Sequence, residues 1–446
     1  MNAARPRFST RITAEVRGAR RLFPFSFSPD IRLRPLAILA ASTGLVMALA
    51  TAPVQAGDWP QFLGPTRDGR YDGPKLNESW PAEGPKVLWK RPVGHAFAGP
   101  AVADGKVILF HRVEDREVVE ALDAVSGKAL WKFDYATAYQ DDFGFDDGPR
   151  ATPTIAGGRI YSFGAEGSLH CLDLATGKNV WEVDTKARYA AGKGFFGLVC
   201  APLVEGDAVL LNIGGRDGAG IVAFHKDTGK LLWKATDDEA SYSSPVAATL
   251  NGKRAAVFFT RAGLVVLDPA TGTVRSRFTW RSRMGASVNA AAPIVVGDDI
   301  FLTASYQTGA VLLHATEGSL QKVWSGDQSL SSHYATSVYR DGFLYGYDGR
   351  QEMGPSLRCI EFKTGKVRWT QEGFGAGTVI LAGDRMLLMK EDGNVVLAAA
   401  SPDKYQQLAS AQVLGRGVRP YPALADGRFY ARDTKNLVCL ELISKP

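Results

Sequence analysis

The chain has 446 residues, more than a single hydrophobic core usually holds, so several domains or a repeat architecture are expected. Apolar residues make up 45 % and charged residues 22 %, which excludes a disordered chain. The formal net charge of +6 arises within residues 1–56, which hold eight arginines and two acidic residues. The remainder is neutral and gives no electrostatic reason to bind nucleic acid or an anionic membrane.

Residues 1–56 have the layout of an export signal. An Arg-rich stretch precedes an apolar run over 36–52, and Val54-Gln55-Ala56 fits a signal-peptidase site. A permanent membrane anchor is the alternative, but a run of about 17 residues is short for a spanning helix. We therefore predict a signal peptide over 1–56, no transmembrane span after its cleavage, and a protein exported to a periplasmic or extracellular location.

The mature chain is predicted to begin with a strap. Residues 58–69 combine aromatic side chains with glycine and proline, and no repeat has yet started there. We expect residues 57–85 to lie as an N-terminal strap on a repeat domain that covers 86–446.

Two patterns alternate along the repeat domain. The first is a small or apolar run, a proline slot, two apolar residues, a polar turn and a second apolar strand. Its proline slots lie 42 to 53 residues apart, at Pro100, Pro153, Pro202, Pro245, Pro293, Ser337, Val379 and Pro422. The second is an apolar strand, a Ser/Thr-Gly-Lys turn and a tryptophan, as in residues 122–131. A period of 40–50 residues indicates a propeller or a solenoid.

The short strands and tight turns predicted within each repeat favour a propeller over a solenoid. Each unit holds four short stretches with strand character, separated by Asp-Gly, Gly-Gly or Thr-Gly turns, and four antiparallel strands make one blade. Nothing in 86–442 has the pattern of a long amphipathic helix. An indole at the start of the outer strand can pack between neighbouring blades, so we predict a structural role for the tryptophans in that slot: Trp89, Trp131, Trp181, Trp233, Trp324 and Trp369.

Eight inner-strand markers predict eight blades. Trp89 precedes the first inner strand, while only three strands follow Tyr421. Strand 86–92 must therefore complete the last blade, so that N- and C-terminal strands share one sheet and the seam has no open edge. The prediction is an all-β fold, a single eight-bladed β-propeller.

The turn-and-tryptophan motif, repeated around eight blades, resembles the pyrroloquinoline-quinone (PQQ)-like propeller repeat family. The resemblance covers roughly residues 86–442. That family includes quinoprotein alcohol dehydrogenases and the BamB subunit of the outer-membrane β-barrel assembly machinery, so the resemblance implies either a PQQ enzyme or a scaffold. The dehydrogenases place two adjacent cysteines against PQQ and bind Ca²⁺ through Glu and Asn beside a catalytic Asp. This chain has no Cys-Cys pair and no matching set, and we assign no catalytic residue.

Binding residues are expected where the connections from outer to inner strands gather, which we call the loop face. Side chains just before the inner strands should point towards the axis there: Arg150, Tyr242, Asn289, His333, Tyr334, Phe374, Arg419 and Tyr421. Arginines with aromatic rings would suit an anionic aromatic ligand such as a quinone carboxylate. The alternative is that these polar groups simply hydrate the mouth of the channel.

One loop-face connection is strongly acidic. It carries four carboxylates within seven residues, which could supply oxygen ligands for Ca²⁺: Asp141, Asp142, Asp146 and Asp147. The spacing lacks the alternation of an EF-hand, so a solvated loop is the favoured interpretation and no metal site is assigned.

The loop face also has the composition of a protein-contact surface. Residues 186–196 and 280–284 are basic and aromatic, and 135–145 are acidic and aromatic. We therefore predict an exported, non-enzymatic and monomeric binding platform for a protein partner or a small ligand, with BamB-like scaffolding as one version. The alternative is a divergent PQQ-dependent oxidoreductase that acts on alcohols or sugars.

Overall fold

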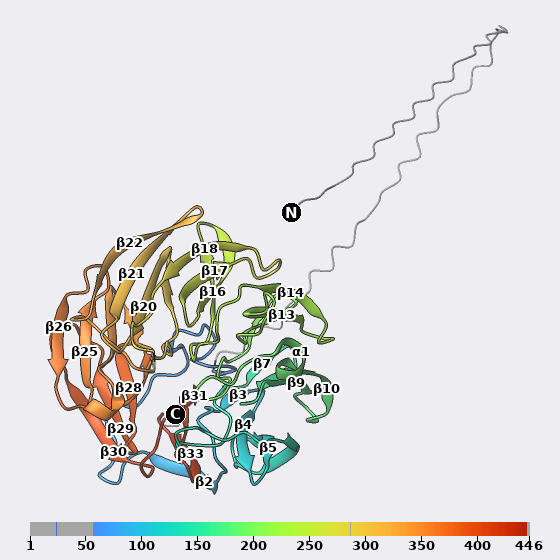
Figure 1. Ribbon diagram of the computed structural model, residues 1–446. Coiled ribbons are helices and arrows are strands. Elements are labelled where there is room, and N and C mark those ends of the chain that lie inside the picture. The colour runs from blue at the N-terminus through green and yellow to red at the C-terminus, as the bar shows by residue number, and fades with distance from the viewer. Residues whose placement is uncertain (1–23, 25–56, 286, 444–446) are drawn as a thin grey trace, which may run out of the picture. The chain divides into compact units, whose positions relative to one another are not determined.

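Eight β-sheets follow one another around a ring within residues 57–285 and 287–443 (Figure 1). The computed structural model describes these two ranges and Pro24, so the rest of the predicted signal peptide lies outside the described residues. The chain divides into two units, residues 1–50 and 51–446, and the ring belongs to the second. The predicted eight-bladed β-propeller is confirmed.

Each blade contributes strands at four distances from the axis. The inner strands are β3 (Ala101–Ala103), β7 (Thr154–Ala156), β11 (Leu203–Glu205), β15 (Val246–Leu250), β19 (Ile294–Val296), β23 (Val338–Arg340), β27 (Gly377–Ala382) and β31 (Ala423–Ala425). The second strands are β4 (Lys106–Val113), β8 (Arg159–Phe163), β12 (Ala208–Asn212), β16 (Lys253–Phe259), β20 (Asp299–Ala304), β24 (Phe343–Asp348), β28 (Arg385–Lys390) and β32 (Arg428–Arg432).

The outer half of each blade follows the same order. The third strands are β5 (Arg116–Asp123), β9 (Ser168–Asp173), β13 (Ile221–His225), β17 (Gly263–Leu267), β21 (Gly309–Thr316), β25 (Ser356–Glu361), β29 (Asn394–Ala399) and β33 (Asn436–Glu441). The outer strands are β6 (Ala129–Ala136), β10 (Asn179–Asp184), β14 (Leu231–Ala235), β18 (Val274–Thr279), β22 (Ser319–Gly326), β26 (Val367–Gln371), β30 (Gln407–Gln412) and β2 (Lys86–Pro92). Three short elements complete the described chain: β1 (Arg70–Tyr71), α1 (Thr185–Tyr189) and the 3₁₀ turn η1 (Gln351–Met353).

Burial changes from the middle of a blade to its rim. All five residues of β12 are buried, because this strand packs on both faces against neighbouring blades. The outer strand β10 alternates between exposed and buried residues after its first residue, as expected for a strand with one face in water. The apolar core therefore lies between adjacent blades, in a series of clusters around the ring.

An indole ring joins each of six blades to the next one. The Nε1–H of each outer-strand tryptophan donates to a backbone carbonyl of the following blade: Trp89 to Ala124 (3.2 Å), Trp131 to Leu174 (3.1 Å), Trp181 to Lys226 (2.8 Å), Trp233 to Pro269 (3.1 Å), Trp324 to Phe362 (2.9 Å) and Trp369 to Ser401 (2.9 Å). Five of these rings also cover a turn glycine with positive φ: Gly127, Gly177, Gly229, Gly272 and Gly365. The six tryptophans therefore link neighbouring blades through their rings and their N–H donors.

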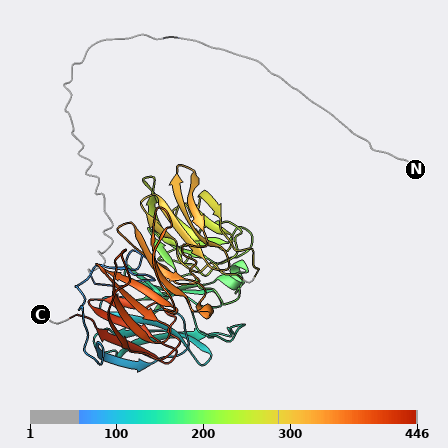
Figure 2. The ribbon, with the colours of Figure 1, turned by 90° about the vertical axis from the view of Figure 1, so that its left-hand side faces the viewer.

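The seam is closed as expected. Strand β2 pairs antiparallel with β33, from Lys86 opposite Glu441 to Pro92 opposite Asn436. In Figures 1 and 2 the blue β2 arrow lies beside the red C-terminal strands. Because Trp89 on β2 also bonds Ala124 of the first blade, the last blade is tied to the first by the same contact as the others.

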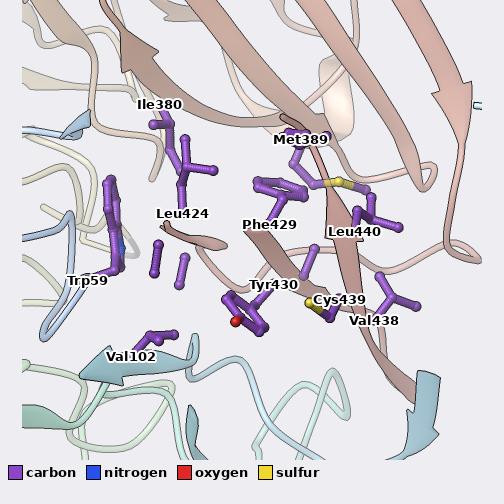
Figure 3. Close-up of a cluster of buried hydrophobic side chains, with 14 of the residues drawn as sticks. Trp59, Val102, Ile380, Met389, Leu424, Phe429, Tyr430, Val438, Cys439 and Leu440 are labelled. Carbon is purple, nitrogen blue, oxygen red and sulfur yellow. The ribbon is translucent and has the colours of Figure 1, made fainter. Parts of the chain in front are cut away.

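The N-terminal strap enters the ring instead of lying only on its surface. Trp59 bridges to Val102 of β3, Pro60 accepts a hydrogen bond from Ile155 of β7, and β1 pairs in parallel with β27. Figure 1 shows the blue trace of this segment among the inner strands. In Figure 3, Trp59 stands in one apolar cluster with Val102 and Leu424. The strap thus crosses the axial channel and uses the free edges of several inner strands.

Arg67 anchors the strap at the axis. It is 3 % exposed, and its guanidinium donates to the carbonyls of Ala201 (3.3 Å), Pro202 and Pro245 (2.9 Å). Burial lowers its pKa to about 10, and none of the described carboxylates forms an ion pair with it. Its charge is therefore satisfied by peptide dipoles at the starts of β11 and β15.

Among the described residues, no helix is long and apolar enough to cross a membrane.

Replacing Gly177 by alanine should destabilise the propeller more than the same change at Gly157. Both glycines have positive φ, 72° and 56°, so each alanine adds about 1 kcal/mol of backbone strain. An added Cβ at Gly177 would collide with the Trp131 ring, whereas at Gly157 it meets no other described atom within 4 Å. Overpacking should cost a further ~1–3 kcal/mol. Urea denaturation midpoints check the difference, and equal shifts would contradict the indole contact.

Arg67→Met should lower the free energy of unfolding by about 2–4 kcal/mol, because it leaves several buried carbonyls without a donor. Arg70→Met is the matched control, since Arg70 is an exposed arginine on the same segment. That variant should change stability by less than about 0.5 kcal/mol. Thermal unfolding of the two variants checks the prediction, and similar midpoints would show that the axial anchor adds no stability.

Candidate functional site

A cavity of about 660 Å³ opens on the loop face of the propeller. Six of the eight side chains predicted for this site line it: Arg150, Tyr242, His333, Tyr334, Arg419 and Tyr421. Its wall is dominated by aromatic rings from all around the axis: Phe62, Phe97, Phe143, Phe145, Phe195, Phe196, Tyr242, Tyr306, Tyr334 and Tyr421. This is the composition of a pocket for a planar apolar molecule with a few polar groups.

Three kinds of segment build the pocket. The connections from outer to inner strands carry most of the lining, as expected. Turns between second and third strands add Tyr306, the Arg350–Glu352 stretch and Glu391, which the sequence analysis missed. The strap adds Phe62, whose ring meets Tyr421 edge-on at 4.8 Å between centroids. Because successive strands run in opposite directions, the second-to-third turns share a face with the outer-to-inner connections, and this rule could have identified those residues.

Arg150 is the most constrained polar group in the wall. The residue is 9 % exposed, and its Nε donates to the Phe196 carbonyl at 2.7 Å. Its Nη2 pairs with Asp141, and its guanidinium carbon lies 4.8 Å from the centre of the Phe97 ring. No acceptor among the described residues takes a hydrogen bond from Nη1, although this atom is buried. Arg150 therefore carries one spare donor at a pocket wall.

Arg419 also packs against aromatic rings of the pocket wall. Its guanidinium carbon lies 5.2 Å from the Phe97 ring centre and 5.0 Å from that of Phe145. Its Nε is 3.3 Å from Glu391 Oε1, and the Tyr334 hydroxyl donates to the same oxygen at 2.7 Å. Burial, followed by the charge of Glu391, holds the pKa of Tyr334 well above its usual value. The phenol therefore stays protonated and serves as a hydrogen-bond donor.

His333 and Tyr306 form a polar pair in the wall. His333 Nε2 and the Tyr306 hydroxyl are 2.8 Å apart, and His333 Nδ1 is 3.9 Å from Glu352 Oε2. Arg350 pairs with Glu352 and lies over the Tyr306 ring at 4.6 Å. Burial lowers the pKa of His333 to about 4, so the imidazole is neutral at pH 7. Tyr306 has φ of 63°, which costs backbone strain and directs its ring to this wall.

Tyr242 holds one aromatic loop in place, because its hydroxyl accepts hydrogen bonds from the backbone N–H groups of Phe195 (2.7 Å) and Phe196 (3.2 Å).

Two of the predicted site residues do not line the pocket. The Asn289 amide donates to the Thr260 carbonyl at 2.9 Å and is 2 % exposed, so it braces the backbone below the loop face. Phe374 packs in an apolar cluster between blades.

The four aspartates of the acidic loop have separate partners. Asp141 pairs with Arg150, Asp142 with Lys193 at 2.5 Å, and Asp146 lies 3.5 Å from His95. Asp147 accepts a hydrogen bond from the Asp141 N–H at 2.8 Å. Within residues 57–285 and 287–443, no group of three or more His, Cys, Asp or Glu side chains is arranged to hold a metal ion.

The fold and its repeated indole contacts define a β-propeller of the PQQ-like type. A family model described as "Outer membrane protein assembly factor BamB" matches residues 115–371, more than half of the chain. The chain belongs to this family.

Similar proteins fall into two functional classes. The outer membrane protein assembly factor BamB of Bordetella pertussis is 25 % identical over 331 residues, 62 % of this chain and 79 % of that protein. The quinohemoprotein alcohol dehydrogenase ADH-IIG of Pseudomonas putida is 30 % identical over 141 residues, 31 % of this chain but 19 % of that protein. The match thus spans about a fifth of the dehydrogenase.

A solved structure extends the likeness of fold to most of the chain. The quinohemoprotein alcohol dehydrogenase from Comamonas testosteroni superposes with a TM-score of 0.60 at 16 % identity. The superposition covers 89 % of this chain and 82 % of that one. At this identity the likeness shows the shared propeller, and the function has to be argued from the pocket.

His333→Gln should reduce the loss of stability on acidification. A histidine in the unfolded chain has a pKa near ~6.5. In the folded protein the value is about 4, so the unfolded chain binds more protons between these pH values and stability falls as the pH drops through that window. Removing the imidazole should recover up to ~3 kcal/mol of that loss. Urea denaturation at pH 7 and pH 4.5 checks it, and an unchanged difference would contradict a buried neutral His333.

Proposed function

We propose that the protein is an exported, non-enzymatic binding platform whose loop-face pocket takes a small planar aromatic ligand. The observation that carries this proposal is the aromatic wall of the cavity, which also holds the guanidinium group of Arg419, a quarter of whose side chain is exposed. Ring faces offer stacking surfaces, and the N–H groups of an exposed guanidinium donate to acceptor atoms of a ligand. Export is proposed from the sequence of residues 1–56.

Different pocket residues would have different roles in binding the ligand. Phe97 lines the pocket and packs against the guanidinium groups of both Arg150 and Arg419, so it holds the two arginines in the wall. Phe62 forms part of the floor because the strap closes the channel below the pocket. Tyr242 fixes the loop that carries Phe195 and Phe196. A ligand that fills the pocket would therefore touch residues from the strap and from several blades at once.

A divergent PQQ-dependent oxidoreductase acting on alcohols or sugars is the second candidate. The position of the pocket at the channel mouth and the names of the dehydrogenase relatives favour it. The residues fit PQQ in part, because the aromatic wall would accept its ring system, whereas Arg150 and Arg419, which would meet its carboxylates, are already paired with acids. They do not fit its calcium ion, since no group of three or more His, Cys, Asp or Glu side chains in the described chain is arranged to hold a metal. We therefore derive no oxidation step.

A protein partner on the same face remains the third version of the platform. Phe143, Phe145 and Met353 are 56 %, 50 % and 77 % exposed, and all three lie in or beside the segments that line the pocket. Exposed aromatic and methionine side chains are enriched in protein contacts. The BamB relative is named as an assembly factor, and we propose comparable binding of a protein for this chain without assigning the partner.

The purified protein should bind xanthone, a flat tricyclic ketone, in equilibrium dialysis read by absorbance. Phe97→Ala should weaken this binding about tenfold, because it removes an aromatic wall contact worth roughly 1–1.5 kcal/mol and the ring that holds Arg150 and Arg419. Phe343→Ala is the matched control, since Phe343 is also half-buried beneath an arginine (Arg368, 5.9 Å) but lies outside the pocket.

No binding of xanthone by the folded wild-type protein would contradict the proposed function. Binding that Phe97→Ala and Phe343→Ala weaken equally would show that xanthone occupies another surface. Saturable, Ca²⁺-dependent binding of PQQ together with alcohol-dependent reduction of a dye would instead establish the oxidoreductase.

A further inference from the structure

The pocket contains three arginines, and each has a carboxylate partner. Arg150 pairs with Asp141, Arg350 pairs with Glu352, and Arg419 Nε lies 3.3 Å from Glu391. Glu352 and Glu391 belong to the pocket wall itself, while Asp141 lies directly behind Arg150 with its side chain fully buried. His333, the remaining titratable base of the lining, is neutral at pH 7. The described pocket is therefore electrically balanced.

We infer that the pocket selects an uncharged planar aromatic ligand that bears hydrogen-bond acceptor oxygens at its edge, and that it discriminates against carboxylated ones. This inference rests on the proposed function and narrows its ligand class. It also revises the expectation of an anionic ligand such as a quinone carboxylate, which was based on Arg150 and Arg419 without their acidic partners.

A carboxylate would lose water on entering this pocket and would find no unpaired positive charge to replace it. At Arg150 it would have to compete with Asp141, and at Arg419 it would share the guanidinium with the negative charge of Glu391, which lies 3.3 Å from Nε. It would also approach the negative charges of Glu352 and Glu391 in the wall. An uncharged ring avoids both costs and keeps the contacts with the aromatic faces.

The accessible donor in the pocket wall favours acceptors on the ligand. The side chain of Arg419 is a quarter exposed, and Glu391 lies against its Nε. A guanidinium group can only donate. A carbonyl or ether oxygen at the edge of a flat ring would accept from its terminal N–H groups without adding charge.

Glu391→Gln tests the inference through a matched pair of ligands, xanthone and xanthone-2-carboxylate, measured by equilibrium dialysis at pH 7. The wild-type protein should bind xanthone at least about tenfold more tightly than its carboxylate, because the carboxylate is desolvated without a free counter-charge. Glu391→Gln leaves an amide that can still accept from Tyr334 but frees the charge of Arg419. The ratio of the two affinities should therefore shift several-fold towards the carboxylate.

Glu317→Gln is the control, because it makes the same change of net charge at an exposed glutamate that pairs with Lys253 outside the pocket. It should leave the affinity ratio unchanged. Tighter binding of the carboxylate than of xanthone by the wild-type protein would overturn the inference and leave the proposed function standing. An identical shift in both variants would also overturn it, because it would reflect overall charge. Failure of both ligands to bind would overturn the proposed function and the inference together.

Discussion

The propeller depends on one contact that is repeated around the ring, the indole of one blade set against the turn of the next. Each of the six tryptophans buries a large apolar ring and satisfies its single N–H donor on a carbonyl, as for Trp181 and Lys226 at 2.8 Å. The turn glycine beneath the ring must have positive φ and no side chain, as Gly229 does. One interaction therefore fixes both the spacing of the blades and the residue at their turns.

Rigid spacing of the blades decides where the loop-face side chains meet. Arg150, His333 and Arg419 come from connections that are far apart in the sequence, and they line one cavity because the ring holds their blades at fixed positions. The strap adds a second constraint from below, since Arg67 ties it to the starts of β11 and β15. Phe62 then reaches the floor of the pocket on a segment that is anchored on both sides. Stability and ligand binding thus share the same residues near the axis.

The sequence predicts the fold almost completely because the fold is encoded by local signals that recur. Turn glycines, proline slots and Trp89 before the first inner strand suffice to count the blades and to close the seam. The site is predicted less fully. Arg150 and Arg419 were found because they precede inner strands, whereas Glu391 lies in a turn between second and third strands and has no motif around it. The path of the strap through the channel was not predicted, because Arg67 binds backbone carbonyls, which leave no pattern in side-chain types.

The residues that were missed change the chemistry of the pocket. If only the arginines are considered, the loop face is positively charged and suited to an anionic ligand. With Glu352 and Glu391 in the wall, the same arginines become neutral ion pairs that stiffen the wall and stack on Phe97 and Tyr306. Their remaining contribution to a ligand is N–H donation, as from the part-exposed guanidinium group of Arg419. A propeller scaffold can therefore keep its pocket at the same place on the axis while the class of ligand changes. Acidic residues added in the turns between second and third strands are sufficient for this change. The repeats that define the fold stay the same.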